Sequence, residues 1–455
     1  MLTLKNGGYM FLHTKKALAA LVVSSFVMPI ALAGNGSPVV TITPEVGTIY
    51  QNILKEPVIT KTLADLKADD DRALAELKTI TEIPSPPFKE GERAVYVLAR
   101  FQELGLKDAY IDKEGNVIGL RQGTAKGGPL LVLSAHIDTV FPEGTDVTVK
   151  ERDGKFFAPG ISDNSRGVTT LIAILKAMNE NNIKTVGDIM FVANVGEEGE
   201  GDLRGVKALF RDHQNIAGFI SIDNGSLENV TNQATGSHRY EVVFTGPGGH
   251  SFGAFGKVPS AIHAMGRAIS KIGDIQVPAD PKTTFTVGTV TGGTSVNSIA
   301  GEARMKLDLR SNDMAALLDL EKQATAAIHA GVDEENARWQ SEGKITVELK
   351  PIGDRPAGST AADSLIMQAE AASLQALGLD VKQLVAASTD SNVPMSLGIP
   401  SLTVGKGGQA GGAHSLEEWY IHKDAWMAAQ NAMLLSIGLV GLDGVSEPLL
   451  EVHGQ

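Results

Sequence analysis

The chain has 455 residues, 43% of them apolar and 20% charged, which is the composition of a soluble globular protein long enough for two or three domains. Its formal net charge of −13 argues against nucleic acid and anionic membrane surfaces as partners. The absence of cysteine excludes disulfides, thiolate metal ligands and a cysteine nucleophile, so histidine, aspartate and glutamate are the candidate metal ligands.

The first 33 residues have the pattern of a secretory signal peptide. Two lysines precede an apolar run at 17–33, which ends in Ala-Leu-Ala before Gly34. The alternative is an uncleaved anchor, because about 17 apolar residues is near the lower limit for a membrane span. We predict cleavage after Ala33 and export, most simply to a bacterial periplasm, with no membrane contact in the mature form. Residues 1–33 hold three lysines and no acid, so cleavage would make the net charge more negative.

The next part of the chain predicts an α/β fold. Amphipathic helical patterns at 62–80 and 90–106 flank an extended proline-rich segment. From residue 109 onward strands and helices alternate: strands are expected within 109–121, 129–140, 188–198 and 218–225, and helices at 165–181 and 203–213. This alternation predicts a mostly parallel sheet with helices on both faces. Ligands of such sheets bind beyond the carboxyl ends of the strands.

The pattern changes near residue 233. Residues 233–354 predict strand, helix, strand, strand, helix and strand, which is the ferredoxin-like α+β order. After Arg355 the α/β pattern returns, with a strand at 400–405, a glycine-rich loop leading to His414, and helices at 361–377 and 424–442. We therefore predict one α/β domain built from residues 34–232 and 355–455, with the α+β domain inserted into it.

Histidines and acids gather where the predicted strands end. His136 and Asp138 follow an apolar run, and the two-residue period of a strand points both to one face. The other candidates at strand ends or in the loops after them are Asp163, Glu197, Glu198, Asp223 and His414. Imidazole and carboxylate ligands suit zinc, cobalt or manganese.

Asp163 could have a purely structural role, whereas burial gives Glu197 and Glu198 a physical reason to lie near a cation. Asp163 precedes a predicted helix and could simply cap it. Glu197 and Glu198 end an apolar strand, where an unpaired carboxylate is costly and a cation would relieve the cost. Because neighbouring side chains project differently, one of them can bind a metal while the other faces a water molecule.

The chain resembles the di-zinc metallopeptidase family that includes aminoacylase, glutamate carboxypeptidase, peptidase T, succinyl-diaminopimelate desuccinylase and acetylornithine deacetylase. The resemblance covers about residues 70–440 and includes the Asp223 strand end. The matching motifs are LSAHIDTVF, GISDNSRGVTTLIAIL, GEEGEGDLRG, TGPGGHS and GGAHS. It implies that the α/β domain is catalytic and that residues 233–354 form a lid and dimerisation domain.

The resemblance also implies roles for the strand-end residues. His136 would bind one divalent ion and His414 the other, with Asp163 bridging both and Glu198 and Asp223 completing the two coordination shells. The ions would be zinc, with cobalt or manganese as alternatives. A water between two such ions is acidified and becomes a nucleophile. Two further residues would serve catalysis: Glu197 as general base, and Asp138 as the group that orients His136.

In the lid, the resemblance implies contacts to the substrate. His250 matches a histidine that reaches the partner's active site in dimeric relatives, so a homodimer through the lid is expected. Asn297 and Arg310 match substrate-holding positions, the arginine pairing with a carboxylate. The segment 389–392 resembles another part of the family near the site, with no role assigned beyond substrate contact.

Taken together, the sequence predicts an exported zinc amide hydrolase that acts on short peptides as an amino- or carboxypeptidase. The alternative is a deacylase of N-acyl amino acids, which would share all the metal ligands. Two readings from other classes are a metal-dependent phosphoesterase and a catalytically silent peptide-binding protein.

Overall fold

The computed structural model describes residues 39–339 and 342–452, so the predicted signal peptide lies outside the described residues. The chain there begins with four helices: α1 Pro44–Lys55, α2 Pro57–Ala68, α3 Asp70–Thr81 and α4 Gly91–Glu103. Prolines occupy the first turns of α1 and α2, where a missing N–H costs nothing. The helical pattern at 62–80 is confirmed, and the structure divides it into two helices at Asp69, where three successive acids favour the start of a new helix.

The central sheet follows the order β1-β2-β6-β3-β7-β17-β8-β15, with β16 paired to β8. Strands β6, β3, β7 and β17 run parallel, which confirms the predicted mostly parallel sheet. The bounds are β1 Tyr110–Ile111, β2 Val117–Arg121, β3 Leu130–His136, β6 Asp188–Asn194, β7 Ile216–Asn224, β8 Asn229–Ala234, β15 Gly358–Ser359, β16 Gln383–Ala387 and β17 Ser401–Gly405.

Helices cover both faces of this sheet, because successive side chains of β3 pack alternately into two different cores. Leu131 and Leu133 belong to a large core shared with α1, α2, α4, α5, α9 and α11. Leu130 and Val132 belong to a smaller core on the opposite face, shared with α6 and α10. The remaining helices are α5 Gly167–Glu180, α6 Arg204–Asp212, α9 Leu365–Ala376, α10 Asn392–Ser396 and α11 Trp426–Val440, with a π-helical turn η1 Ile161–Arg166 and a 3-10 turn η2 Gly199–Gly201.

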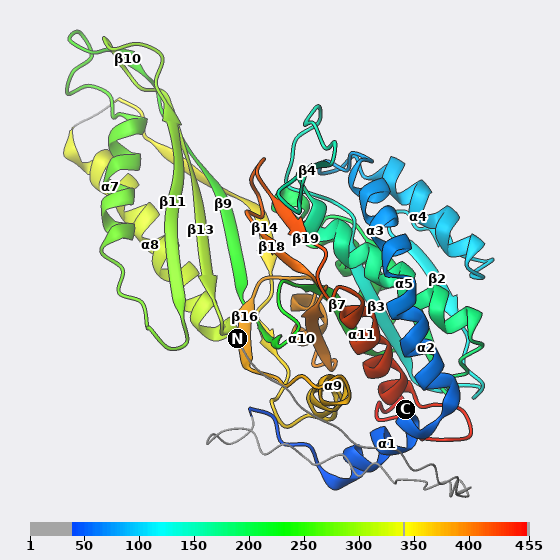
Figure 1. Ribbon diagram of the computed structural model, residues 1–455. Coiled ribbons are helices and arrows are strands. Elements are labelled where there is room, and N and C mark those ends of the chain that lie inside the picture. The colour runs from blue at the N-terminus through cyan, green and yellow to red at the C-terminus, as the bar shows by residue number, and fades with distance from the viewer. Residues whose placement is uncertain (1–38, 340–341, 453–455) are drawn as a thin grey trace, which may run out of the picture. The chain divides into compact units, whose positions relative to one another are not determined.

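The inserted part has its own antiparallel sheet, in the order β11-β13-β9-β14. Helices α7 and α8 pack along it over a separate apolar core (Figure 1). This is the ferredoxin-like arrangement that the sequence predicts. Its elements are β9 Gly236–Thr245, α7 Ala261–Gly273, β11 Thr283–Gly292, β13 Glu302–Ser311, α8 Met314–Arg338 and β14 Thr346–Arg355, with a short ribbon of β10 Gly249–His250 and β12 Ser298–Ile299. The domain boundaries at 232/233 and 354/355 stay a prediction.

A small antiparallel sheet, β18-β19-β5-β4, is absent from the sequence analysis. Its strands are short: β4 Lys150–Arg152, β5 Lys155–Phe157, β18 Gln409–Gly411 and β19 Trp419–Ile421. It joins segments more than 250 residues apart, Trp419 with Phe157 for example. It brings the loop that contains His414 next to the segment that carries Asp163.

Candidate metal centre

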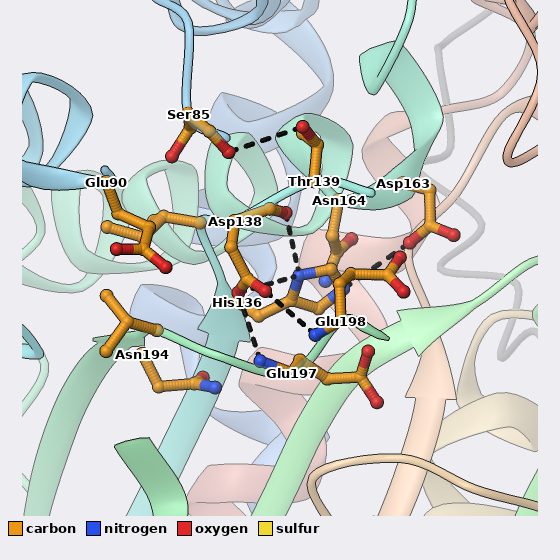
Figure 2. A network of polar contacts seen from close by, with 12 residues as sticks. Ser85, Glu90, His136, Asp138, Thr139, Asp163, Asn164, Asn194, Glu197 and Glu198 are labelled. Carbon is orange, nitrogen blue, oxygen red and sulfur yellow. Dashed lines mark hydrogen bonds and ion pairs between the residues drawn. The ribbon is translucent and has the colours of Figure 1, made fainter. Parts of the chain in front are cut away.

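The centre is built on the carboxyl end of β3, where His136 is completely buried. Its Nδ1 lies 3.6 Å from Asp138 Oδ1 and 3.1 Å from the backbone oxygen of Asp138 (Figure 2). Asp138 also accepts the backbone N–H groups of Glu197 at 3.1 Å and Glu198 at 2.8 Å. Burial alone raises the pKa of Asp138, but the contact with His136 and these two N–H groups hold it below its usual range. Asp138 thus lies on the side of His136 that the sequence analysis expects.

The other ring nitrogen of His136 faces two carboxylates. Its Nε2 lies 3.4 Å from Asp163 Oδ1 and 3.8 Å from Asp223 Oδ2. This nitrogen is buried and has no hydrogen-bond partner among the described residues, which is costly for a polar atom unless another partner is supplied. Asp223 arrives there because β7, which lies next to β3, also ends at this edge of the sheet.

His414 approaches from the glycine-rich loop on the other side of Asp163. Its Nε2 lies 3.3 Å from Asp163 Oδ2 and 2.9 Å from Glu198 Oε1. His414 has a left-handed backbone, with φ of 64°, and Gly412 two residues before it has φ of 72°, a conformation that favours glycine. Contacts with Asp163 and Glu198 raise the pKa of His414 to about 10, so this position favours positive charge. Asp163 therefore presents one oxygen to each histidine.

These donor atoms fit divalent metal ions. Tetrahedral zinc with ligand bonds of about 2.0 to 2.1 Å places its ligand atoms about 3.3 Å apart. Ligand atoms of His136, Asp163 and Glu198 all lie within 4.8 Å of one another. The His136–Asp163 distance of 3.4 Å and the His414–Asp163 distance of 3.3 Å match that spacing. The orphaned Nε2 of His136 and the convergent carboxylates have the chemistry of a zinc, cobalt or manganese site.

Asp163 does not cap the following helix, so that alternative is wrong. Its backbone has φ of −109° and ψ of 92°, outside the helical region, and Asn164 Oδ1 instead accepts the N–H of Gly167 at 3.0 Å. The N–H of Asp163 donates to Glu418 Oε1 at 2.9 Å. Glu418 also accepts the N–H groups of Gly160 at 2.9 Å and Ser162 at 2.8 Å. One buried carboxylate therefore fixes the segment that carries the candidate bridging ligand.

Glu197 lies beside this group of ligands without joining it (Figure 2). Its Oε1 lies 3.3 Å from Arg355 Nη1, and Arg355 Nη2 donates to its backbone oxygen. Burial raises the pKa of Glu197 well above its usual range, and the charge of Arg355 opposes that rise. A carboxyl group with a raised pKa that borders a cavity is a candidate general base.

The ligands open onto a cavity of about 380 Å³. From the candidate centre it is lined by Asp163, Glu197, Glu198, Asp223 and His414, and from the inserted part by Arg239 and Arg310. Arg310 Nε donates to Asp308 Oδ2 at 2.8 Å, and no described residue forms a hydrogen bond with its two terminal nitrogens.

Four predicted site residues do not line the cavity: His136 and Asp138 lie buried beneath it, and His250 and Asn297 lie away from it. His250 lies in β10 and is exposed. Asn297 is also exposed, and its side chain accepts a hydrogen bond from Ser295 Oγ at 2.6 Å. Both belong to the β10–β12 region of the inserted part, where Ser251 N–H donates to the backbone oxygen of Asn297 at 3.0 Å.

Three charged residues at the centre were not predicted from the sequence: Arg355, Lys406 and Glu418. All three are buried, and each contacts a candidate site residue. Lys406 Nζ, for example, lies 2.8 Å from Asp223 Oδ1. Burial alone lowers the pKa of Lys406, but the charges of Asp223 and Asp163 raise it above its ordinary value. The one available signal was position, since Lys406 directly follows the apolar strand β17.

Comparison with known proteins agrees with this architecture. The profile of peptidase family M20/M25/M40 matches residues 132–437, about two thirds of the chain. A protein of Pyrococcus abyssi described as a LysW-lysine/LysW-ornithine hydrolase is 39% identical over 129 residues, 28% of this chain and 34% of that protein. Carboxypeptidase G2 of a Pseudomonas species is 24% identical over 243 residues, 52% of this chain and 54% of the relative.

The chain therefore spans about a third to a half of the length of these curated relatives. Among solved structures, aminopeptidase PepT of Bacillus cereus superposes with a TM-score of 0.66 at 21% identity, over 80% of this chain and 97% of that one. This likeness establishes the fold. The family profile covers both the metal-centre motifs and the inserted sheet, and the chain therefore belongs to peptidase family M20/M25/M40.

Proposed function

We propose that this protein is an exported metallohydrolase that cleaves amide bonds of short peptides, as an amino- or carboxypeptidase with two divalent ions, most simply zinc. The observation that carries the proposal is the position of Asp163 between two histidines, one oxygen toward each, at 3.4 Å and 3.3 Å. In one position His136, Asp163 and Asp223 would hold an ion. In the other, Asp163, Glu198 and His414 would hold the second.

Divalent ions bound there would polarise the scissile carbonyl and make an attacking water molecule more acidic. Glu197, beside the ligands, takes the proton of that water and gives it to the leaving amine. Arg355 orients its carboxyl group through the contact between Nη1 and Oε1. Asp138 faces Nδ1 of His136 and so fixes the orientation of the imidazole ring, with Nε2 pointing to the carboxylates.

The positive charge of Arg310 in the cavity lining favours substrates that carry a free carboxylate. Arg310 lines it, uses Nε for Asp308 and leaves the ends of its guanidinium group available for a second carboxylate. A carboxypeptidase substrate and an N-acyl amino acid both offer such a group beside the scissile amide. A deacylase of N-acyl amino acids is therefore the second candidate function.

Further parts of the proposal concern the whole chain. His250 and Asn297 would act at the site of a partner subunit in a homodimer joined through the lid, which accounts for their exposure away from their own cavity. The signal pattern of residues 1–33 supports export to the periplasm. Among the described residues, no helix has the length and apolarity to cross a membrane.

A substrate panel tests this function. Dipeptides, tripeptides, N-acetyl amino acids and nitrophenyl phosphate are incubated with the zinc-loaded protein, the chelated protein and the Glu197→Ala variant. Release of free amino acids that needs metal and disappears in Glu197→Ala is expected, and the cleaved members identify the substrate class. Turnover of the phosphate ester alone would favour a phosphoesterase. Peptide binding that survives in Glu197→Ala, with no turnover in the parent, would favour a binding protein.

A further inference from the structure

Lys406 places a buried positive charge against two carboxylates of the candidate metal centre. Its Nζ lies 2.8 Å from Asp223 Oδ1 and 3.6 Å from Asp163 Oδ1, and its side chain is only 7% exposed. A buried ammonium group is destabilising unless nearby groups compensate its charge. Here the compensating groups are the carboxylates that would also hold a metal ion, so Lys406 and that ion share the same partners.

The backbone of Lys406 is held on several sides, which keeps the ammonium group at this place. Its N–H donates to the backbone oxygen of Asn224 at 2.9 Å, one residue beyond Asp223. Its carbonyl oxygen accepts hydrogen bonds from Arg166 Nε at 3.0 Å and from Thr170 Oγ1 at 3.1 Å. The parallel pairing of β17 with β7 sets this register, because Gly405 lies opposite Asn224. The charge is therefore part of the centre's rigid framework.

The contacts of Lys406 distinguish the two metal positions. The first, here called the His136 position, is formed by His136, Asp223 and the Oδ1 atom of Asp163. The second, the His414 position, is formed by His414, Glu198 and the Oδ2 atom of Asp163. Lys406 forms both of its ion pairs with carboxylate oxygens at the His136 position, Asp223 Oδ1 and Asp163 Oδ1. Glu198 instead faces His414, at 2.9 Å.

We propose that Lys406 makes the two metal positions unequal, so that the His136 position binds its divalent ion more weakly than the His414 position. The proposal rests on the two-ion centre of the proposed function. A fixed positive charge repels a dication held by the same carboxylates and takes up part of their negative charge. Even after screening by solvent and by the shared carboxylates, such a repulsion lowers affinity on the order of tenfold or more. Mild chelation should therefore remove one ion and leave the other at the His414 position.

Metal titration tests this inference without measuring activity. The metal-free mature chain is titrated with Zn²⁺ in competition with a chromophoric chelator, and bound zinc per chain is measured by mass spectrometry. The key variant is Lys406→Gln, which removes the charge and keeps a hydrogen-bond donor for Asp223. Lys406→Arg keeps the charge. Lys382→Gln, at an exposed lysine paired with Glu228, controls for the change in net charge.

The parent should show two zinc affinities separated on the order of tenfold or more, and Lys406→Gln should tighten the weaker one by a similar factor. Lys406→Arg and Lys382→Gln should keep the separation. In the parent background, Asp223→Asn should abolish the weaker ion and Glu198→Gln the tighter one, and this assignment tests the inference even if Lys406→Gln does not fold.

Equal affinities in the parent, an unchanged separation in Lys406→Gln, or loss of the tighter ion in Asp223→Asn would each overturn the inference. A purely structural lysine would shift the thermal unfolding of the metal-free chain and leave the separation intact. A parent chain that binds no zinc would overturn the proposed function as well, whereas two equal ions would overturn only the inequality.

Discussion

At the scale of single residues, the candidate base Glu197 depends on one arginine. Arg355 contacts Glu197 twice, with Nη1 3.3 Å from Oε1 and Nη2 donating to the backbone oxygen. Nη1 also donates to Ser388 Oγ at 3.2 Å. The guanidinium fork thereby fixes both the main chain and the carboxyl group of Glu197. A lysine has the same charge, but its single ammonium nitrogen cannot contact both groups of Glu197 with the fixed geometry of a guanidinium.

Replacement of Arg355 by lysine is expected to lower kcat by about 10- to 100-fold with a smaller change in KM, because a misplaced base slows proton transfer more than it weakens binding. Steady-state kinetics on whichever substrate the panel identifies measure this. Arg152→Lys, at an exposed arginine paired with Glu417, is the matched control. An unchanged kcat in Arg355→Lys would show that the fork has no part in orienting the base.

At the scale of elements, Glu418 ties the small sheet to the turn that carries Asp163. Its carboxylate accepts three backbone N–H groups from the segment 160–163, at 2.8 to 2.9 Å. Hydrogen bonds to a charged group are worth about 1.5 to 3 kcal/mol each in favourable cases. Removal of this carboxylate frees the turn and leaves three backbone donors, in two buried and one partly buried hydrogen bond, without this partner.

For Glu418→Ala we expect the free energy of unfolding of the metal-free protein to fall by about 2 to 4 kcal/mol. Zinc affinity should fall by about 10- to 100-fold, because the support of a ligand is lost. Chemical denaturation and chelator competition measure the two effects. Glu417→Ala, one residue earlier and exposed, should change neither. Full zinc affinity in Glu418→Ala would mean that the turn holds its shape without this contact.

A second element-scale feature is Glu370, a fully buried carboxyl group on α9 that accepts hydrogen bonds from Asn431 on α11. Burial raises the pKa of Glu370 to about 7, and Asn431 partly opposes the rise. The folded state therefore binds a proton that the unfolded chain releases near its ordinary pKa of about 4.3. By linkage, the protein loses stability as pH rises from that value to about 7, and the loss is complete above pH 7.

Glu370→Gln removes this titration while keeping an acceptor for Asn431. Relative to the parent, the variant should gain stability as pH rises from 5 to 8, by on the order of 2 to 3 kcal/mol. Denaturant unfolding at both pH values measures the difference. If the free energies of unfolding of parent and variant differ by the same amount at pH 5 and at pH 8, the pKa of Glu370 is not raised.

At the scale of the whole molecule, the sequence predicts the fold through local patterns. Period-two and period-3.6 patterns locate the strands and helices, and apolar strands that end in acids point to the edge where the ligands meet. His136, Asp163 and His414 lie near one another because parallel strands and their loops share that edge.

The missed residues depend on contacts between distant segments. Arg355 and Glu197 are 158 residues apart, Lys406 and Asp223 are 183 apart, and Glu418 and Asp163 are 255 apart. A lone arginine, lysine or glutamate has no periodic signal, and its partner follows from the tertiary fold alone. The division between α2 and α3 at Asp69 has a local cause, since helical periodicity continues across it while the acid cluster favours a new start.

Export makes a prediction about the mature chain. If residues 1–33 are a signal peptide, protein recovered from the periplasmic fraction should begin at Gly34. Intact mass spectrometry and N-terminal sequencing measure this, with a variant that has arginine in place of Ala31 and Ala33 as the uncleaved control. A periplasmic or membrane-bound product that retains the first 33 residues would identify the segment as an anchor.

The measurement that tests the central claim most directly is zinc per chain in the parent protein and in Asp163→Asn. Asp163 faces both histidines, so its loss should damage both positions at once. After dialysis against dilute zinc, we expect about two ions per chain in the parent and fewer than about one in the variant, with the fold retained by circular dichroism. A parent without bound zinc, or an Asp163→Asn variant that keeps both ions, would contradict the two-metal centre described here.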